Sequence, residues 1–280
     1  MKTRHYFTFC ITILFLAGAF LGAQEKPADR ATVPFSDPTK PGKLEVGVHN
    51  GGITVKGYDG KEVIVEAKVR EQLIGEERRE EREKSKGLRK IQVSTGTGLE
   101  IEEEGNKMEV SVASLKQTVD LVIQVPYATS LEIHAFNNGD IIVENIKGEI
   151  EANNHNGKLT LTGIAGSLVA HTFNGSVRVT FTDVDSDKPM SFSTWNGDID
   201  VTFPANIKAK VKMNSERGDV YSDFDIRIDQ SPQKIEEDER KEGGKFRISF
   251  EKYIYGAING GGPEYTFKNF NGDIYIRKGK

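Results

Sequence analysis

Cysteine is almost absent from this chain of 280 residues. The single one, Cys10, lies inside an apolar stretch near the amino terminus that we expect to be removed. A mature chain without cysteine has no disulfide bond, no thiolate-bound metal and no cysteine nucleophile. Its stability must therefore come from packing and hydrogen bonding alone.

The chain also lacks an excess of positive charge and the common catalytic motifs. Its formal net charge is −4, which leaves no electrostatic footprint for nucleic acid, so no nucleic-acid partner is expected. Gly96-Thr97-Gly98 has no third glycine and lies among expected strands, so it does not predict a dinucleotide site. Neither a serine nucleophile elbow nor a His-Glu-x-x-His motif occurs. We expect no enzyme activity, no catalytic residues, no cofactor and no bound metal.

A secretory signal peptide is predicted at residues 1–23. Lys2 and Arg4 provide a basic start, residues 7–21 carry no charge, and small residues precede a return to polar sequence. Cleavage is expected after Ala23, with a site after Ala19 as the alternative. An uncleaved anchor is a further alternative, although the apolar run is shorter than the ~20 residues that a spanning helix needs. Export predicts a periplasmic or extracellular location, with no transmembrane span after cleavage.

The remaining chain divides by composition. Residues 24–42 contain four prolines and little apolar content, which is typical of a linker. Residues 43–280 are predicted to form one β-repeat domain, because apolar residues recur at every second position along many short stretches. Charged insertions interrupt this pattern near 71–90 and 229–245, and they are expected to form a short solvated helix or a mobile loop.

An internal repeat is the most informative feature of the sequence. Gly139, Gly157 and Gly175 are 18 residues apart, each follows Asn, and Gly148 and Gly166 fall midway. A nine-residue unit holds one strand of about five residues and one turn of about four. One such unit cannot bury its own apolar face, so stacked neighbours must supply the core. We predict an all-β, elongated, parallel β-solenoid or β-roll-like stack. It is preferred to a meander of hairpins because the repeat keeps a fixed register over several copies. Further copies occur at Gly197 and Gly272, with a degenerate one at Gly218 and an early relative at Gly51.

Side chains at equivalent repeat positions should form columns. The apolar residues after each glycine are expected on the inner face: Ile141, Val143, Leu159, Leu161, Val177, Val179, Ile199 and Val201. The turn asparagines are expected to form an amide ladder: Asn138, Asn156, Asn174 and Asn196. Gly157 and Gly175 are expected at positive φ, as tight turns require.

Aspartates follow several of the repeat glycines and raise the question of calcium. A carboxylate ladder is one interpretation, but the Gly-Gly-x-Gly-x-Asp pattern of calcium-binding repeats is missing. Solvated turn residues are therefore preferred for Asp140, Asp198, Asp219 and Asp273.

Aromatic residues lie two positions before the repeat glycine: His155, Phe173, Trp195 and Phe270. Such a row could seal the turn layer or bind glycan or peptide. Phe173 and Trp195 are the candidate contact surface. The histidines His49, His134, His155 and His171 occupy different repeat positions and are not expected on one line, which argues against a metal site.

Several motifs resemble one bacterial family. Thr54-Val55-Lys56-Gly57-Tyr58-Asp59 followed by Glu62-Val63-Ile64-Val65 resembles its opening, and Asp120-Leu121-Val122-Ile123-Gln124-Val125-Pro126 its central strand. The Asn-Gly-Asp-Ile repeats and Tyr221-Ser222-Asp223-Phe224 resemble its second half. The family is DUF4097, the adhesin-like toastrack domains. The resemblance implies an extracytoplasmic β-solenoid-like domain, in some cases encoded with envelope-stress systems, and it carries no catalytic residues.

Two functions remain open at this point. The first is a non-enzymatic extracytoplasmic adhesin-like binding or scaffold domain of the bacterial envelope or surface, with an unknown protein or glycan as its partner. The alternative is an accessory component of an envelope-stress sensing system. A polysaccharide-cleaving enzyme is disfavoured, because outside Asp198 and Asp200 the repeat offers no aspartate pair on one strand face.

Overall fold

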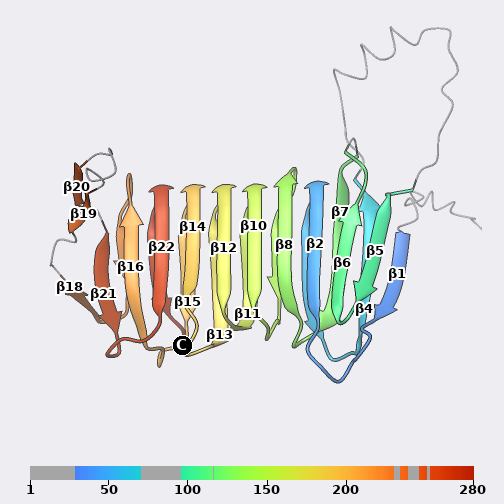
Figure 1. Ribbon diagram of the computed structural model, residues 1–280, viewed down its shortest axis with the longest axis horizontal. Helices are drawn as coiled ribbons and strands as arrows, with labels where there is room; N and C mark the ends of the chain where they lie inside the picture. The colour runs from blue at the N-terminus through green and yellow to red at the C-terminus, as the bar shows by residue number, and fades with distance from the viewer. Residues whose placement is uncertain (1–28, 71–95, 116, 230–233, 239–245, 251–252) are drawn as a thin grey trace, which may run out of the picture.

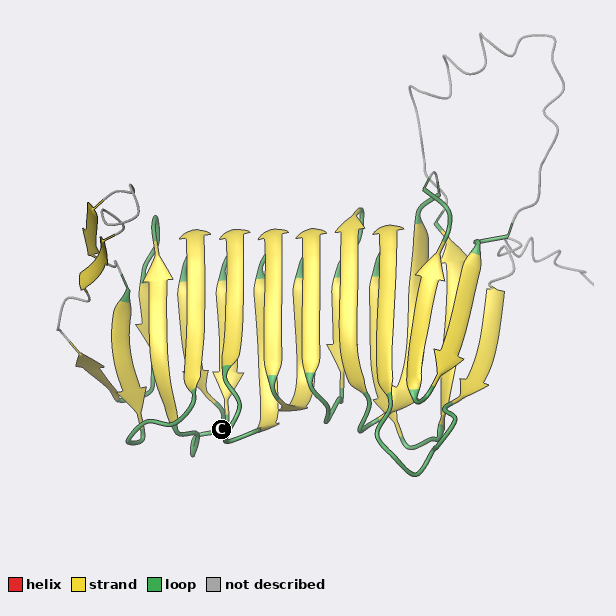
Figure 2. Cartoon of the chain, viewed as in Figure 1, coloured by secondary structure: helices red, strands yellow, loops and turns green. Residues whose placement is uncertain are grey.

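Alternating apolar residues form strands because successive side chains of a strand point to opposite faces. The computed structural model describes residues 29–70, 96–115, 117–229, 234–238, 246–250 and 253–280. Within these residues it contains 23 strands, and no helix there is long and apolar enough to cross a membrane. The all-β class predicted from the sequence is confirmed (Figure 2).

Most strands belong to two sheets that run the length of the molecule (Figure 1). The 11-stranded sheet has the spatial order β18 (Ile226–Asp229), β21 (Ile254–Ile258), β16 (Ala209–Ser215), β22 (Glu264–Asn271), β14 (Met190–Asn196), β12 (Leu168–Asn174), β10 (Ile150–Asn156), β8 (Ser130–Asn137), β2 (Lys43–Asn50), β6 (Lys107–Val112) and β5 (Leu99–Glu104). The 10-stranded sheet has the order β1 (Asp29–Pro34), β4 (Glu62–Val69), β7 (Val119–Pro126), β3 (Ile53–Tyr58), β9 (Ile141–Glu144), β11 (Leu159–Gly166), β13 (Val177–Val184), β15 (Ile199–Phe203), β23 (Ile274–Lys278) and β17 (Val220–Ser222). A separate hairpin pairs β19 (Lys234–Asp238) with β20 (Phe246–Phe250).

The parallel register confirms the solenoid. Strands that follow each other in the chain, such as β10 and β11, lie in different sheets, and each pairs in parallel with the strand of the next coil. Ile150 of β10 faces Leu168 of β12, which is one 18-residue repeat later. A meander of hairpins would instead pair sequence neighbours antiparallel. The Asn-Gly turns therefore carry the chain from one sheet to the other.

The coils do not stack entirely in chain order. β22, near the end of the chain, lies between β14 and β16, and it pairs in parallel with both. Antiparallel strands complete each end, with β1, β4 and β5 at one end and β18 and β21 at the other. The repeat at Gly218 is thus the outermost copy, and the last repeat of the sequence lies inside it.

The core lies between the two sheets. The eight apolar residues expected on the inner face are all buried, and none exposes more than 1% of its surface. Toward the β14–β22 end the core is filled by stacked and edge-on aromatic rings, among them Phe181, Phe192, Phe203, Tyr265 and Phe267. Large rings fill the interval between sheets, so the interior of this part is packed by the chain's own side chains.

An asparagine ladder runs along the turn layer. Asn156 donates its amide to Asn137 Oδ1 at 2.7 Å, Asn174 to Asn156 at 2.8 Å, Asn196 to Asn174 at 2.8 Å and Asn271 to Asn196 at 3.3 Å. The prediction was wrong at one rung, because Asn137 rather than Asn138 occupies the ladder. Asn138 is an extra turn residue with φ 63°, and its amide donates to Asn50 at 3.3 Å.

A column of glycines lies beside this ladder. A Cβ placed on Gly157 would lie 2.1 Å from the carbonyl oxygen of Gly139, and one on Gly175 would lie 2.1 Å from that of Gly157. The expected positive φ is wrong for Gly157, which does not have one, and Gly175 at 159° is close to extended. Glycine is needed here because the backbones of successive turns approach too closely for a side chain.

Buried polar side chains satisfy the carbonyl groups of this glycine column. Thr172 Oγ1 donates to Gly157 O and Thr194 Oγ1 to Gly175 O, both at 2.8 Å. The same position of other coils provides Asn154, Asn269 and Ser215, which donate to the glycine carbonyls of their neighbours. Each of these carbonyl groups therefore has a hydrogen-bond partner from the adjacent coil. The partner matters because a buried acceptor left without a hydrogen bond costs free energy of folding.

The repeat aspartates join neighbouring turns. The carboxylate of Asp140 accepts the backbone N–H of Lys158 at 2.8 Å, Asp198 that of Asp273 at 3.0 Å, and Asp273 that of Asp219 at 2.9 Å. In the described residues no group of three or more histidines, cysteines or acids is arranged to hold a metal ion. The aspartates therefore act as turn acceptors between coils.

Three predicted segments need comment. Residues 1–23 and 71–90 lie outside the described residues. The predicted linker includes β1, which pairs antiparallel with β4. The charged stretch 229–245 was predicted to be a helix or a loop, but its residues 234–238 form β19, because antiparallel pairing with β20 supplies their backbone hydrogen bonds.

Replacement of Gly157 by Ala tests the close approach. We expect Gly157→Ala to lower the free energy of unfolding by about 1–3 kcal/mol, because the new methyl group meets the backbone of Gly139. Gly47→Ala is the matched control, since a Cβ there meets nothing within 4 Å. Urea unfolding followed by circular dichroism measures both, and equal stability of the two variants would contradict the packing described here.

Candidate functional site

One exposed feature follows directly from the ladder. On six neighbouring strands of the 11-stranded sheet, the residue immediately before the ladder asparagine is a ring that points outward. We call this set the aromatic row: His49, Phe136, His155, Phe173, Trp195 and Phe270. Because the parallel register places equivalent residues side by side, the rings form one continuous stack across the coils.

The rings of the aromatic row meet face to face. Their centroids are separated by 5.2, 4.7, 5.1, 5.7 and 4.1 Å along the row, with interplanar angles of 15° or less. The Arg217 guanidinium lies 5.1 Å from the centroid of Phe270 and closes one end. Ring faces are thus covered by neighbouring rings, and the surface available to a ligand consists of ring edges.

The candidate residues Phe173 and Trp195 are the fourth and fifth rings of this row and remain accessible. Phe173 exposes 38% of its surface and Trp195 45%, and their ring centroids are 5.7 Å apart. The structure brings together all four ring residues expected from the sequence. It adds His49, which lies two residues before Gly51, and Phe136, which the extra residue Asn138 places three residues before Gly139. Counting from the ladder asparagine finds them, since a ring precedes Asn50 and Asn137 in the same way.

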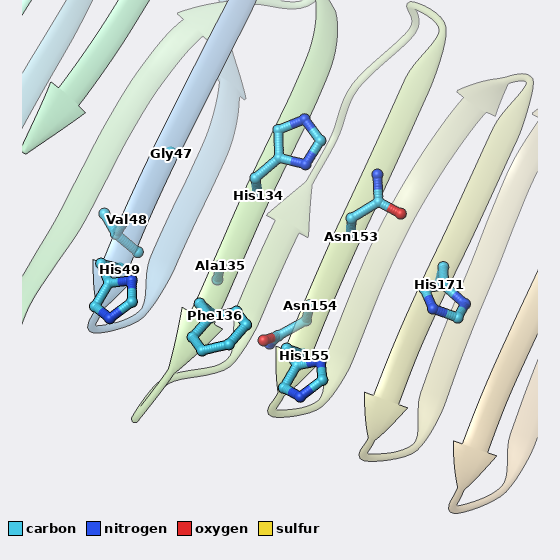
Figure 3. A pocket seen from close by; sticks show the side chains of 10 residues that line it. All are labelled: Gly47, Val48, His49, His134, Ala135, Phe136, Asn153, Asn154, His155 and His171. Carbon is cyan, nitrogen blue, oxygen red and sulfur yellow. The ribbon is translucent and has the colours of Figure 1, made fainter.

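A second row runs parallel to the first, two residues earlier on each strand. We call it the polar row: His134, Asn153, His171, Ser193 and Lys268. A shallow groove of about 600 Å³ lies over the part of the two rows between β2 and β12, lined among others by His134, Asn153 and His171 of the polar row (Figure 3).

The histidine expectation needs correction. His49 and His155 lie in the aromatic row, and His134 and His171 lie in the polar row. Each pair shares one repeat position, so the four histidines do not lie on one line, as expected, but adjacent rows of one face bring all four to the same groove (Figure 3). The sequence did not predict this gathering, because it depends on which coils are neighbours.

Hydrogen bonds fix two of these imidazoles. His171 Nδ1 lies 2.8 Å from Ser193 Oγ, and His134 Nε2 lies 3.3 Å from Glu132 Oε1. Desolvation by the surrounding protein, with a smaller contribution from the charge of His155, lowers the pKa of His171 below its ordinary 6.5. The pKa of Glu132 is lowered by its hydrogen bonds, first from Lys43 and then from His134.

These contacts define what the groove offers chemically. The Ser193–His171 contact joins a hydroxyl to an imidazole, but among the described residues no carboxylate hydrogen-bonds the other ring nitrogen of His171. The orienting third group of a nucleophilic triad is therefore missing from this pair. What remains is a set of hydrogen-bonding and proton-accepting groups along a shallow surface, which suits binding.

Acid should destabilise the protein partly through His171. Its pKa is lower in the folded than in the unfolded chain, so the unfolded chain binds more protons between the two values. Stability contributed by neutral His171 is full above about pH 6.5 and is lost as the pH falls below it. We expect His171→Asn to flatten the decrease in melting temperature between about pH 7 and 5. Ser193→Ala, which removes the contact but keeps the imidazole, is the control. Identical pH slopes for wild type and His171→Asn would contradict this assignment.

Comparisons with known proteins agree with the fold. The model of the family "Toastrack DUF4097" matches residues 43–277. A solved structure described as a "putative cell adhesion protein" from Clostridium sporogenes ATCC 15579 aligns with 90% of this chain and 100% of its own, at 13% identity and a TM-score of 0.50. Another, described as a "putative adhesin" from Bacteroides fragilis NCTC 9343, aligns with 90% and 97%, at 12% identity and a TM-score of 0.37. No curated protein matches the sequence.

The first of these structures supports the likeness at the level of fold, since its identity is too low to carry a function. The family match covers the repeats and every residue of the two rows described above, and it leaves out β1 at one end of the solenoid. This chain belongs to the DUF4097 toastrack family.

Proposed function

We propose that this protein is a non-enzymatic, exported binding module of the bacterial envelope or surface, adhesin-like in its action. The single observation that carries the proposal is the aromatic row, a continuous stack of six rings along one flank of the solenoid. A continuous line of large exposed rings is unusual on a protein surface that has no binding partner.

The repeated face favours extended contact over catalysis. Each coil adds one ring and one polar-row residue, so a long partner would meet the same chemistry several times. Weak contacts that repeat along one partner add through effective concentration. The groove over the rows is shallow and open, whereas catalysis needs convergent groups in a partly dry pocket. We infer binding without turnover.

An extracytoplasmic location fits both the sequence and the fold. The basic and apolar start of the chain and the mature sequence without cysteine suit export. The solved structure described as a "putative cell adhesion protein" shares this fold, and an adhesin-like role is compatible with that likeness. The partner is an envelope or surface protein or glycan, and Phe173 and Trp195 are the proposed contact residues.

The test replaces Phe173 and Trp195 together by Ser. We expect the purified variant to lose adhesion to bacterial envelope or host glycans, because tryptophan and other aromatic side chains dominate protein contact energies. Tyr221→Ser with Tyr275→Ser is the matched control, since these rings also stack, 5.2 Å apart, but on the 10-stranded sheet.

Folding must be checked beside binding, because each broken ring pair costs about 0.5–1.5 kcal/mol. Circular dichroism and thermal melts should show both double variants folded at the assay temperature. Trp195→Phe keeps a ring in the stack and should keep most of the adhesion. Unchanged adhesion of the folded Phe173→Ser, Trp195→Ser variant would remove the aromatic row as the contact surface.

A further inference from the structure

The face that carries the two rows divides sharply by charge. The aromatic row and the polar row contain no acidic residue, although the whole chain has a net charge of −4. They contain instead the four described histidines and Lys268, with Arg217 stacked on the last ring. Half of this sheet face is therefore neutral to weakly basic at pH 7, and it gains positive charge whenever the histidines take up protons.

Acids also occur on this face toward its two ends, at Glu100, Glu102 and Glu104 on β5, Glu109 on β6 and Glu264 on β22. On the strands next to the groove they form a third row, farther from the turns: Glu45 on β2, Glu132 on β8 and Glu151 on β10. Each already has a partner. Lys107 on β6 lies 2.6 Å from Glu45, Lys43 lies 2.6 Å from Glu132, and Asn153 donates to Glu151 at 2.9 Å. β12 and β14 carry Val169 and Ser191 in this row and so add no charge. At the far end Glu216 lies next to Arg217 in the chain.

Building on the proposed function, we propose that the groove over these two rows binds an acidic polysaccharide, one carboxylate per sugar, under mildly acidic conditions. The polymer lies along the solenoid axis and crosses the strands. Its carboxylates accept hydrogen bonds from the imidazoles of His134, His155 and His171, and toward β22 they approach Lys268.

Protonation turns the groove into an anion site. A neutral imidazole has one N–H donor and one acceptor nitrogen, whereas an imidazolium has two donors and a positive charge. His155 lies on the strand next to His171, and its charge opposes the protonation of His171. A carboxylate placed between them removes that repulsion and offsets the desolvation of His171. Binding and proton uptake are therefore coupled, and each favours the other.

The spacing of the rows favours a sugar chain over an acidic peptide. Neighbouring strands of a sheet are about 4.7–4.9 Å apart, close to the length of one sugar ring along an extended polysaccharide. The carboxylates of a twofold sugar chain alternate between its two sides, so those on one side stay in step with every second strand. An extended peptide advances about 3.3 Å per residue and places same-side groups about twice as far apart, so it falls out of step with the coils. A flat anionic membrane would also meet the acidic third row, which the groove itself avoids.

The mode of contact differs from the usual stacking of sugars on aromatic faces. The ring faces of the aromatic row are covered by each other, at centroid separations of 4.1–5.7 Å. Ring edges carry the positive part of the ring quadrupole, so they suit oxygen atoms and carboxylates. Charge and hydrogen bonds, rather than face stacking, thus determine which glycan binds, and a neutral glycan is a poor ligand.

The test uses the purified full chain and polygalacturonate, with its fully methyl-esterified form as the neutral control of the same backbone. We expect the affinity for polygalacturonate to rise about ten-fold or more between about pH 7.5 and 5.5 at fixed salt, as linked uptake of at least one proton requires. The esterified polymer should bind weakly at both pH values. Calorimetry in buffers of different ionisation enthalpy should detect proton uptake on binding.

Matched variants distinguish binding at this groove from a general effect of the protein's charge. His134→Asn with His171→Asn places in both positions the residue that Asn153 already provides in the same row, and it should reduce the pH dependence markedly, with the remainder due to His155. Arg178→Gln removes a cation from the 10-stranded sheet and should leave binding unchanged. Melting curves at both pH values establish that each variant is folded.

The following results would contradict the inference. Equal binding of the esterified polymer, affinity independent of pH, or an unaffected histidine double variant would each overturn it. Equal or tighter binding of double-stranded DNA or phosphatidylglycerol vesicles at about pH 5.5 would reassign the groove to anions in general. If polygalacturonate fails to bind while envelope adhesion still depends on Phe173 and Trp195, the inference fails and the proposed function stands. If adhesion depends on neither set of residues, both fail.

Discussion

Successive coils of this protein meet backbone to backbone at the repeat glycines, and a side chain at that position has no room. A Cβ on Gly157, Gly175 or Gly197 would lie within 2.1–2.5 Å of the preceding turn. This close approach allows Asn174 to reach both Asn156 and Asn196. It also lets Thr172 satisfy the carbonyl of Gly157 from inside the solenoid. The repeat glycines, the asparagine ladder and the buried hydroxyl groups form one hydrogen-bonded layer. The loss of any one of them weakens the contacts that the other two make between coils.

That layer also determines what the surface offers. The ladder asparagine of each coil fixes the residue before it, so Phe173 and Trp195 stack in register instead of adopting separate rotamers. The polar row follows from the same register two residues earlier, which brings His171 against Ser193. Stability of the turn and chemistry of the groove are therefore linked, and the functional face is a consequence of how the coils lock together.

Much of this architecture could be predicted from the sequence, because its causes are local. Alternation at Ile141 and Val143, and an 18-residue interval between asparagine-glycine pairs, predict parallel coils with a filled core. Features that depend on which coils become neighbours could not be predicted. The placement of β22 between β14 and β16 follows from pairing across dozens of residues.

The two errors at the turn have the same origin. Asn137-Asn138-Gly139 offers two asparagines to one ladder, and only the three-dimensional turn shows that Asn138 adopts φ 63° and leaves the ladder to Asn137. From the sequence, the need for glycine at the repeat turns is attributed to a positive φ angle. The sequence does not show the backbone of the neighbouring coil, which is what leaves no room for a side chain. The histidine groove was missed because His134 and His171 become close only when β8, β10 and β12 align.

The central claim, that the turns form a bonded layer between coils, is tested most directly by amide hydrogen exchange. In the structure Gly157 N donates to Asn174 O at 2.9 Å, Gly175 N to Asn196 O at 2.8 Å, and Gly197 N to Asn271 O at 3.0 Å. Amides that open only with the core exchange slowly, whereas those of surface turns exchange fast. The account predicts that these three glycine amides are protected as strongly as the amides of β10 and β12. Exchange at the rate of a free loop would contradict it.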